Sequence, residues 1–130
     1  FEVKSISNNK PTVFISSVEQ LESTSDGKLI VFHMEKMSPE FNGFSLNPLV
    51  EEILNSFDLE SDRDLFLDKL AQAKYAYSEI YDNYVYNVVK MEKYQVTDNF
   101  PRFKHDDLPR GIVKVKYEIE LSVIEKFKEI

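Results

Sequence analysis

Two charged side chains near the start of the chain, Glu2 and Lys4, have the types and the spacing that suit phosphodiester chemistry. The apolar segment around them predicts a β-strand, in which residues two apart point to the same face. Glu2 and Lys4 then project together, while Phe1 and Val3 face the other way, toward a core. A carboxylate is a hard oxygen ligand for Mg²⁺, and a neighbouring lysine can orient or deprotonate the attacking water, or neutralise charge on the phosphate. A bare Glu-x-Lys is nevertheless common, and it more often marks an edge strand with two solvated charges.

The composition is that of one soluble globular domain, or of one domain and part of another. The chain has 130 residues, of which 42% are hydrophobic and 30% charged, and this length is enough to bury a core. It has no cysteine, which excludes disulfides and thiolate metal sites and suits a reducing cytoplasm. No apolar run approaches the length of a membrane span, and no secretory signal pattern is present. We therefore expect a cytoplasmic protein without a membrane partner. Because it begins with Phe1, inside a predicted strand, we also expect a fragment of a longer protein.

Negative charge is concentrated in the middle of the chain. The net charge of the chain is −7. Residues 1–37 have 4 basic and 5 acidic groups, residues 38–83 have 3 basic and 10 acidic groups, and residues 84–130 have 9 basic and 8 acidic groups. The middle third is therefore the part least suited to contact phosphates. Its two helices and the strands after them could be interpreted as a winged-helix DNA-binding domain. The negative charge argues against this interpretation, because duplex binding needs cations that face phosphates.

The first third of the chain is predicted to hold three strands and a short helix. The strands are apolar and rich in β-branched residues, and they lie at residues 1–6, 12–16 and 29–34. A turn over residues 8–11 joins the first two, which we expect to pair as a hairpin. A serine, Ser16 or Ser17, stands three residues before Glu19 or Gln20, the spacing of a capping box, so a short helix should follow to about Thr24. The third strand is apolar on both faces, which is typical of a buried central strand.

The remainder is predicted to be two helices followed by strands. Asn47 is the expected cap of the first helix, with Pro48 at the first helical position, and Ser61 begins the second helix. Each helix continues in an apolar stripe at helical spacing. Residues 84–96 are rich in tyrosine and valine, and residues 112–121 alternate between apolar and charged side chains. Together these segments predict an antiparallel β-hairpin with one solvent-exposed face. Residues 123–130 are expected to close as a short helix. The fold class is therefore α+β (α/β).

Two stretches of the chain resemble a known family. Residues 1–21 read FEVKSISNNKPTVFISSVEQL, and residues 94–127 read YQVTDNFPRFKHDDLPRGIVKVKYEIELSVIEKF. The first resembles a strand of the type [VF]-E-V-K-[SA] followed by I-S-S-x-E-Q-L. The second resembles a carboxy-terminal pattern of Y-x-V-x-x-x-F-P-R, then L-P-x-G-[IV], then V-x-Y-x-I-x-L. Together they are similar to the bacterial PD-(D/E)XK motif protein family, a nuclease-like family of unknown function, and the helical middle matches in pattern alone.

The resemblance implies a division of the chain into two parts. Residues 1–37 would be the carboxy-terminal part of a restriction-endonuclease-like core, namely a β-hairpin, a short helix and a buried strand. Residues 38–130 would be an accessory subdomain of two helices and an antiparallel β-hairpin.

The resemblance also implies a catalytic site. In this superfamily one strand brings an aspartate and the next brings (D/E)-x-K, whose two charged residues match Glu2 and Lys4. Glu2 is then the expected ligand of Mg²⁺, and Gln20 is expected near the metal or its water, although a helix-cap role is the more frequent one for such a glutamine. The aspartate would lie before Phe1, so the fragment alone is expected to be inactive.

Other residues with chemical potential are assigned structural roles. His33 lies in an apolar strand and is expected to be a hydrogen-bonded core histidine. Arg102 and Arg110 flank proline turns near Asp106 and Asp107, which offer ordinary ion pairs. Several tyrosines have rings that can stack on bases, but packing beside the acidic helices is the expected role of those at positions 75, 77, 81, 84 and 86.

Two functions from different classes follow from these residues. In the first, the full-length protein is a Mg²⁺-dependent DNA endonuclease of prokaryotic restriction or phage-defence type, in which water attacks a phosphodiester. In the second, Glu2 and Lys4 are vestigial, and residues 38–130 form a module that binds a protein partner or closes a homo-oligomer.

Overall fold

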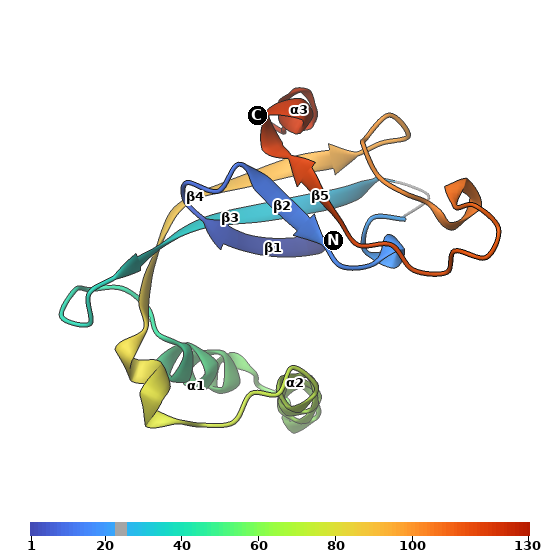
Figure 1. Ribbon diagram of the computed structural model, residues 1–130. Coiled ribbons are helices and arrows are strands. Elements are labelled where there is room, and N and C mark those ends of the chain that lie inside the picture. Colours follow the sequence, from blue (N-terminus) through green and yellow to red (C-terminus); the bar gives the residue numbers. More distant parts are fainter. Residues whose placement is uncertain (23–25) are drawn as a thin grey trace. The chain divides into compact units, whose positions relative to one another are not determined.

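A computed structural model describes residues 1–22 and 26–130 of the chain. The chain forms two compact units (Figure 1), of which unit 1 combines residues 1–35 with residues 88–130 and unit 2 comprises residues 36–87. Each is described by itself. The assignment of residues 1–37 to a nuclease core and of residues 38–130 to an accessory subdomain stays a prediction.

The larger sheet has the strand order β1-β3-β4, with β1 at Glu2–Ser7, β3 at Gly27–Met37 and β4 at Val85–Val96 (Figure 1). β1 and β3 run parallel, and Glu2 lies opposite Leu29 in this register. Leu29 and Val31 of β3 are fully buried, as expected for a central strand. The strand predicted at residues 29–34 is therefore confirmed and is longer than its apolar run.

The second sheet pairs β2 (Thr12–Ile15) with β5 (Tyr117–Glu120) in antiparallel fashion. The two predicted hairpins, one at residues 1–16 and one at residues 84–121, are therefore wrong, although the mixed α+β class is confirmed. The reason is tertiary. β1 gains a buried parallel neighbour in β3, while Val13 and Ile15 are buried completely beneath a strand from the far end of the chain, and such packing overrides local hairpin preference.

The core of unit 1 is shared by both sheets. One cluster joins residues of β1, β2, β3, β4 and β5 with those of the segments that connect them: Ile6, Val13, Ile15, Leu21, Leu29, Val31, Tyr94, Val96, Phe100, Ile119 and Ile124. Burial raises the pKa of Tyr94 in this cluster to about 12, so its phenol stays neutral at physiological pH. The carboxy-terminal part of the chain thus completes the core that the first strands begin.

The two faces of β1 are reversed from the predicted arrangement. Ile6 shares a face with Glu2 and Lys4 and is 8% exposed within the core, because residues at i, i+2 and i+4 of a strand point the same way. Phe1 and Val3 lie on the other face, and their exposed fractions of 90% and 55% contradict the expected core position. The charged pair therefore borders the core instead of pointing away from it.

The strand predicted at residues 112–121 forms only in part. β5 begins at Tyr117, which lies opposite Ile15, the last residue of β2. Residues 112–116 therefore extend beyond the end of β2, and Val113 is 74% exposed despite its alternating pattern. The chain then closes with two short turns of helix, α3 (Leu121–Ile124) and the 3-10 helix η4 (Glu125–Phe127), in place of the single helix expected at residues 123–130.

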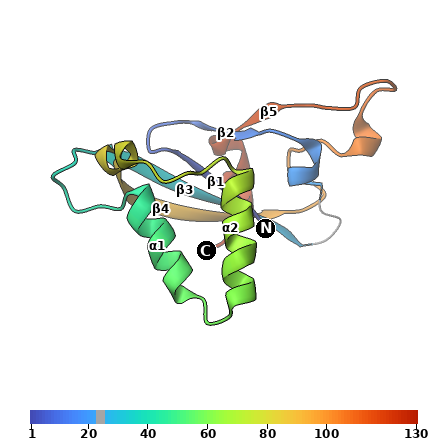
Figure 2. The ribbon, with the colours of Figure 1, turned by 90° about the horizontal axis from the view of Figure 1, so that it is seen from below.

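Unit 2 contains the two main helices, α1 (Leu46–Ser56) and α2 (Glu60–Gln72), which Figure 2 shows side by side. Both predicted helices are confirmed, and α2 begins one residue before the predicted Ser61. The cap predicted at Asn47 is wrong, because α1 begins at Leu46, after Ser45, and Asn47 lies inside it. A 3-10 helix, η2 (Glu79–Asn83), follows them. No helix among residues 1–22 and 26–130 is long and apolar enough to cross a membrane.

The short helix predicted after β2 is a single 3-10 turn, η1 (Val18–Gln20). Its expected end at Thr24 lies outside the described residues. A further 3-10 turn, η3 (His105–Asp107), lies in the long connection from β4 to β5.

Gly43 permits a close backbone approach in unit 2. Phe44 exchanges backbone hydrogen bonds with Tyr86, at 2.9 and 2.8 Å, and a Cβ at position 43 would lie 2.5 Å from the Tyr86 carbonyl oxygen and 2.7 Å from Cγ1 of Val85. We predict that Gly43→Ala lowers the free energy of unfolding by about 1–3 kcal/mol, the usual cost of forced overpacking. Urea unfolding measures this, with Asn42→Ala at the exposed preceding position as control. Equal stability of the two variants would contradict the close approach.

Candidate functional site

The strand β1 places Glu2 and Lys4 side by side. The Lys4 Nζ lies 3.5 Å from Oε1 of Glu2, and their side chains are 18% and 22% exposed, respectively. This partial burial matters because an ion pair that is fully exposed to water contributes little to the stability of the fold. The two groups that the strand pattern predicted to project together are therefore in contact at the border of the core.

Gln20 completes a three-residue cluster with them. Its Oε1 accepts a hydrogen bond of 3.0 Å from Lys4 Nζ and one of 2.9 Å from the backbone N–H of Ser16. The second bond anchors the amide to the chain that leaves β2, so the carbonyl oxygen is held toward the lysine. We refer to Glu2, Lys4 and Gln20 as the lysine cluster. Their proximity was predicted from the sequence, whereas their catalytic and metal-binding roles stay predictions.

A cavity of about 270 Å³ opens beside this cluster. Glu2 and Gln20 line it, together with Glu19 from η1 and Lys28 from β3. It is smaller than most pockets for drug-sized ligands, and its charged lining residues are Glu2, Glu19 and Lys28. Lys28 is ion-paired with Glu129 at 2.9 Å.

Arg102 secures the turn that carries Gln20. Its side chain is 3% exposed, its Nη1 donates to the backbone carbonyl of Leu21, and its Nη2 lies 3.7 Å from Oδ1 of Asp98. The structural role predicted for Arg102 is confirmed, but its partners differ from the predicted Asp106 and Asp107. A sequence pattern shows that an arginine follows Phe-Pro, yet it does not show that the guanidinium reaches a carbonyl 81 positions away.

His105 forms a second connection to the same turn. Its Nδ1 lies 2.5 Å from Oε2 of Glu22 and its Nε2 3.2 Å from Oε1 of Glu19, while its backbone N–H donates to Oε1 of Glu22 at 2.7 Å. The hydrogen bond that the His105 ring donates to Glu22 outweighs desolvation and raises the pKa of His105. Hydrogen bonds from the backbone and ring of His105 lower the pKa of Glu22. Sequence reasoning missed this contact, because the residues are far apart in the chain.

His33 is a core residue, as predicted, but within the described part of the chain its ring nitrogens do not form the expected hydrogen bond. It is 3% exposed, and its Nε2 lies 2.8 Å from Oε1 of Glu92. Although burial raises the pKa of Glu92, hydrogen bonds from Lys128 and Lys90 prevail and lower it. The ion-paired carboxylate gives the buried imidazole a polar partner and leaves it with a structural role.

The described residues do not supply a complete site for Mg²⁺. Among residues 1–22 and 26–130 no group of three histidines, aspartates or glutamates lies close enough together to hold a metal ion. Glu2 fits as one hard oxygen ligand, but a single carboxylate is too few for a stable site unless water, a phosphate or other carboxylates complete the shell.

Comparison with known families gives one match. The family model described as "Putative PD-(D/E)XK family member, (DUF4420)" matches residues 1–122. No curated protein and no solved structure matches the chain. The match covers the lysine cluster, Arg102 and His105 alike.

The bond from Arg102 to Leu21 can be tested by its effect on stability. We predict that Arg102→Ala lowers the free energy of unfolding by about 1–3 kcal/mol, because it leaves a buried carbonyl without its donor. Urea unfolding followed by circular dichroism measures the change. Arg110→Ala, at an exposed arginine, is the control and should leave the midpoint unchanged, so equal effects of the two variants would count against the assigned role.

The contact of His105 can be tested by its pH dependence. Because folding raises the pKa of His105 above 6.5, its contribution to stability is present below 6.5 and is lost as the pH rises through the raised value. Because folding lowers the pKa of Glu22 below 4.5, that contribution is present above 4.5 and is lost as the pH falls. The contact between His105 and Glu22 should therefore stabilise the fold most between pH 4.5 and pH 6.5.

NMR titration of the His105 ring measures the first of these shifts. Glu22→Gln should lower the pKa of His105 toward 6.5 by more than Glu19→Gln does, because the bond to Glu22 is the larger cause of the rise. Equal effects of the two substitutions would show that Glu22 raises the pKa of His105 no more than Glu19 does.

Proposed function

The chain belongs to the PD-(D/E)XK family whose model it matches, and we propose that it supplies the Glu-x-Lys half of a DNA endonuclease site that hydrolyses phosphodiester bonds. The observation that carries this proposal is the convergence of Lys4, Glu2 and Gln20 beside a small cavity. β1 is an edge strand, as in the alternative for a bare Glu-x-Lys, but its two charges are not simply solvated, because both side chains are partly buried and Lys4 bonds a glutamine from another element.

The three residues divide the chemistry between them. Lys4 has three N–H donors, and its contacts with Gln20 and Glu2 aim the ammonium while leaving donor capacity for a phosphate oxygen or for the attacking water. As the water oxygen bonds to phosphorus and the bond to the leaving sugar oxygen breaks, negative charge develops on the phosphoryl group, and a fixed ammonium stabilises it without reorganising. Gln20, whose carbonyl already accepts two bonds, is a positioning residue for Lys4.

The proposed site includes Mg²⁺, for which the described residues supply only part of the ligand set. Mg²⁺, where bound, would stabilise charge on the phosphate and lower the pKa of a bound water. Glu2 would contribute one ligand, and the remaining oxygens would come from water, from the phosphate, or from carboxylates outside these 130 residues. We therefore propose that this chain alone does not cleave DNA.

Charge indicates which unit would face DNA. Unit 1 has 12 basic and 13 acidic residues, a net charge of −1, whereas unit 2 has 4 basic and 10 acidic residues, a net charge of −6. Phosphate contacts require cations, so the side of unit 1 that bears the lysine cluster is the more suitable surface. A cytoplasmic role in prokaryotic restriction or phage defence accords with such an activity and is part of the same proposal.

The second candidate function is a protein-interaction or oligomerisation module in which the lysine cluster is not catalytic. The observation that favours it is an open apolar groove between the helices of unit 2. The two candidates differ in whether the lysine cluster is catalytic, whereas docking at the helices of unit 2 could accompany either, because the groove and the cluster lie in different units.

Plasmid cleavage by the full-length protein tests the catalytic proposal. With Mg²⁺ present, Lys4→Ala should lower the rate of cleavage of supercoiled plasmid by at least about a hundredfold, the usual cost of losing a fixed donor to developing charge. Lys10→Ala removes an exposed lysine whose ion pair with Glu118 spans 3.7 Å, and it should cleave normally. Equal rates for the two variants, with unchanged circular dichroism, would refute the assignment of Lys4.

A further inference from the structure

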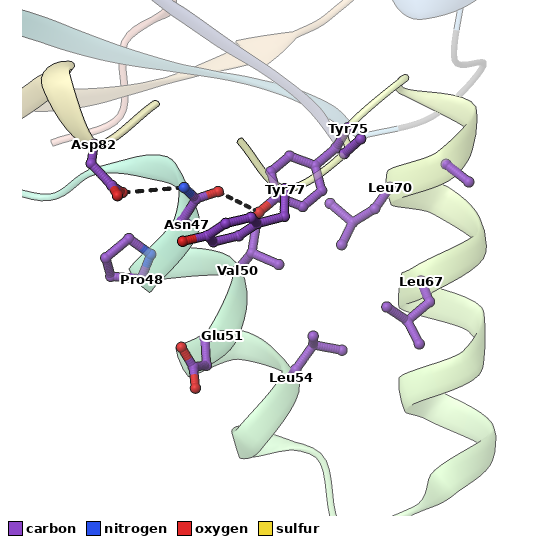
Figure 3. Close-up of a pocket in the computed structure, with 12 residues that line it drawn as sticks. Asn47, Pro48, Val50, Glu51, Leu54, Leu67, Leu70, Tyr75, Tyr77 and Asp82 are labelled. Atoms are coloured by element: carbon purple, nitrogen blue, oxygen red, sulfur yellow. Dashed lines mark hydrogen bonds between the residues drawn. The ribbon is translucent and has the colours of Figure 1, made fainter. Parts of the chain in front are cut away.

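The strongest unassigned feature of unit 2 is a cavity of about 540 Å³ between α1 and α2. We call it the helix groove. Its walls are Val50 and Leu54 of α1, Leu67 and Leu70 of α2, and the rings of Tyr75 and Tyr77, and Figure 3 shows Leu54 and Leu67 facing one another across it.

A buried asparagine preforms one end of the helix groove. Asn47 is 8% exposed and accepts a 2.6 Å hydrogen bond from the hydroxyl of Tyr75 at its Oδ1. Its Nδ2 donates to the Ser78 carbonyl at 2.8 Å and to Oδ1 of Asp82 at 3.1 Å (Figure 3). Asn47 therefore ties α1 to the segment after α2, and this end of the groove is held in shape before anything binds.

The walls of the helix groove remain open to solvent. Leu67 is 48% exposed and Tyr77 70% exposed, and α2 has no buried residue at all. Exposed apolar side chains that gather around one concavity are typical of a surface that another chain covers. Their burial would gain roughly 25 cal/mol for each Å² removed from water.

Charge indicates the chemistry of the occupant. Glu51 and Asp82 line the helix groove, whereas no lysine or arginine does, and unit 2 as a whole has a net charge of −6. A nucleic acid is thus repelled. The matching ligand is a segment that offers an apolar side chain to the walls and cations to the carboxylates, without acids of its own.

Unit 1 presents a segment of this description. Residues 110–116 read Arg-Gly-Ile-Val-Lys-Val-Lys, with three cations and no acid. They extend past the end of β2 and belong to no strand, and Ile112 and Val113 are 46% and 74% exposed. We call residues 110–116 the basic segment. Its β-branched residues, Ile112, Val113 and Val115, suit an extended conformation.

We propose that the helix groove binds the basic segment of a second copy of this chain. Ile112 or Val113 enters between Leu54 and Leu67, and Lys114 lies against Glu51. If each copy offers its helix groove to the other, the two contacts are reciprocal and close a twofold dimer. The contact joins an acidic surface to a basic segment, so its affinity falls as salt is added.

Analytical ultracentrifugation of the chain tests the dimer. Wild-type protein should change from monomer to dimer as its concentration rises through the micromolar range, and Glu51→Lys or Lys114→Glu should each weaken the association by about tenfold. Glu52→Lys and Lys126→Glu make the same charge changes at exposed positions outside both surfaces and should leave it unaltered.

A charge-swap experiment makes the test specific. In an equimolar mixture of Glu51→Lys chains with Lys114→Glu chains, every contact of the mixed dimer pairs opposite charges, so the mixture should associate as wild type does although neither variant does so alone. A monomeric wild type at all concentrations, or a mixture that stays as weak as its components, would overturn the proposal. Protection of the basic segment from hydrogen exchange in a strictly monomeric chain would also overturn it, because the segment would then bind within its own copy.

Discussion

The parallel pairing of β1 with β3 is the constraint on which the candidate site depends. In this register Lys4 lies opposite Val31 and Ile6 opposite His33, so the buried face of β3 determines which face of β1 borders the core. A slip of one residue would move every side chain of β1 to the opposite face. Glu2 and Lys4 would then lie where Val3 is now exposed, far from Gln20. The charged pair is fixed because Ile6, two positions on, is committed to the core.

The carboxy-terminal third explains why two distant sequence patterns occur together in this chain. β5 pairs with β2, Arg102 binds the Leu21 carbonyl, and His105 reaches Glu22. All three contacts act on the stretch from β2 to Glu22, which carries Gln20. The FPR pattern and the strand after it are thus the structural support of the lysine cluster, and their separation in sequence disappears in the fold.

The limits of sequence-based prediction follow the same physics. The helices at Leu46 and Glu60 and the face shared by Glu2 and Lys4 could be predicted, because periodicity and helix-start signals are local. Strand partners could not, since β2 meets β5 across a hundred positions and no local pattern encodes that choice. Resemblance to a family, more than spacing, placed Gln20 near Lys4. The Arg102 and His105 contacts escaped prediction because they reach across 81 and 83 positions of the chain, from Arg102 to the Leu21 carbonyl and from His105 to the Glu22 carboxylate.

Charge separates the two units, and this separation bears on how one protein can combine the two proposed activities. Unit 2 carries −6 of the total −7, while unit 1 is almost neutral and presents both the lysine cluster and the basic segment. A polyanion therefore meets less repulsion at unit 1 than at unit 2. If the basic segment were a phosphate-binding element instead, DNA would compete with dimer formation for the same three cations, and Lys114→Glu would weaken DNA binding together with association. If it docks in the helix groove, those cations are neutralised by acids of the partner copy, and contact with the backbone of DNA falls to the lysine cluster and its neighbours.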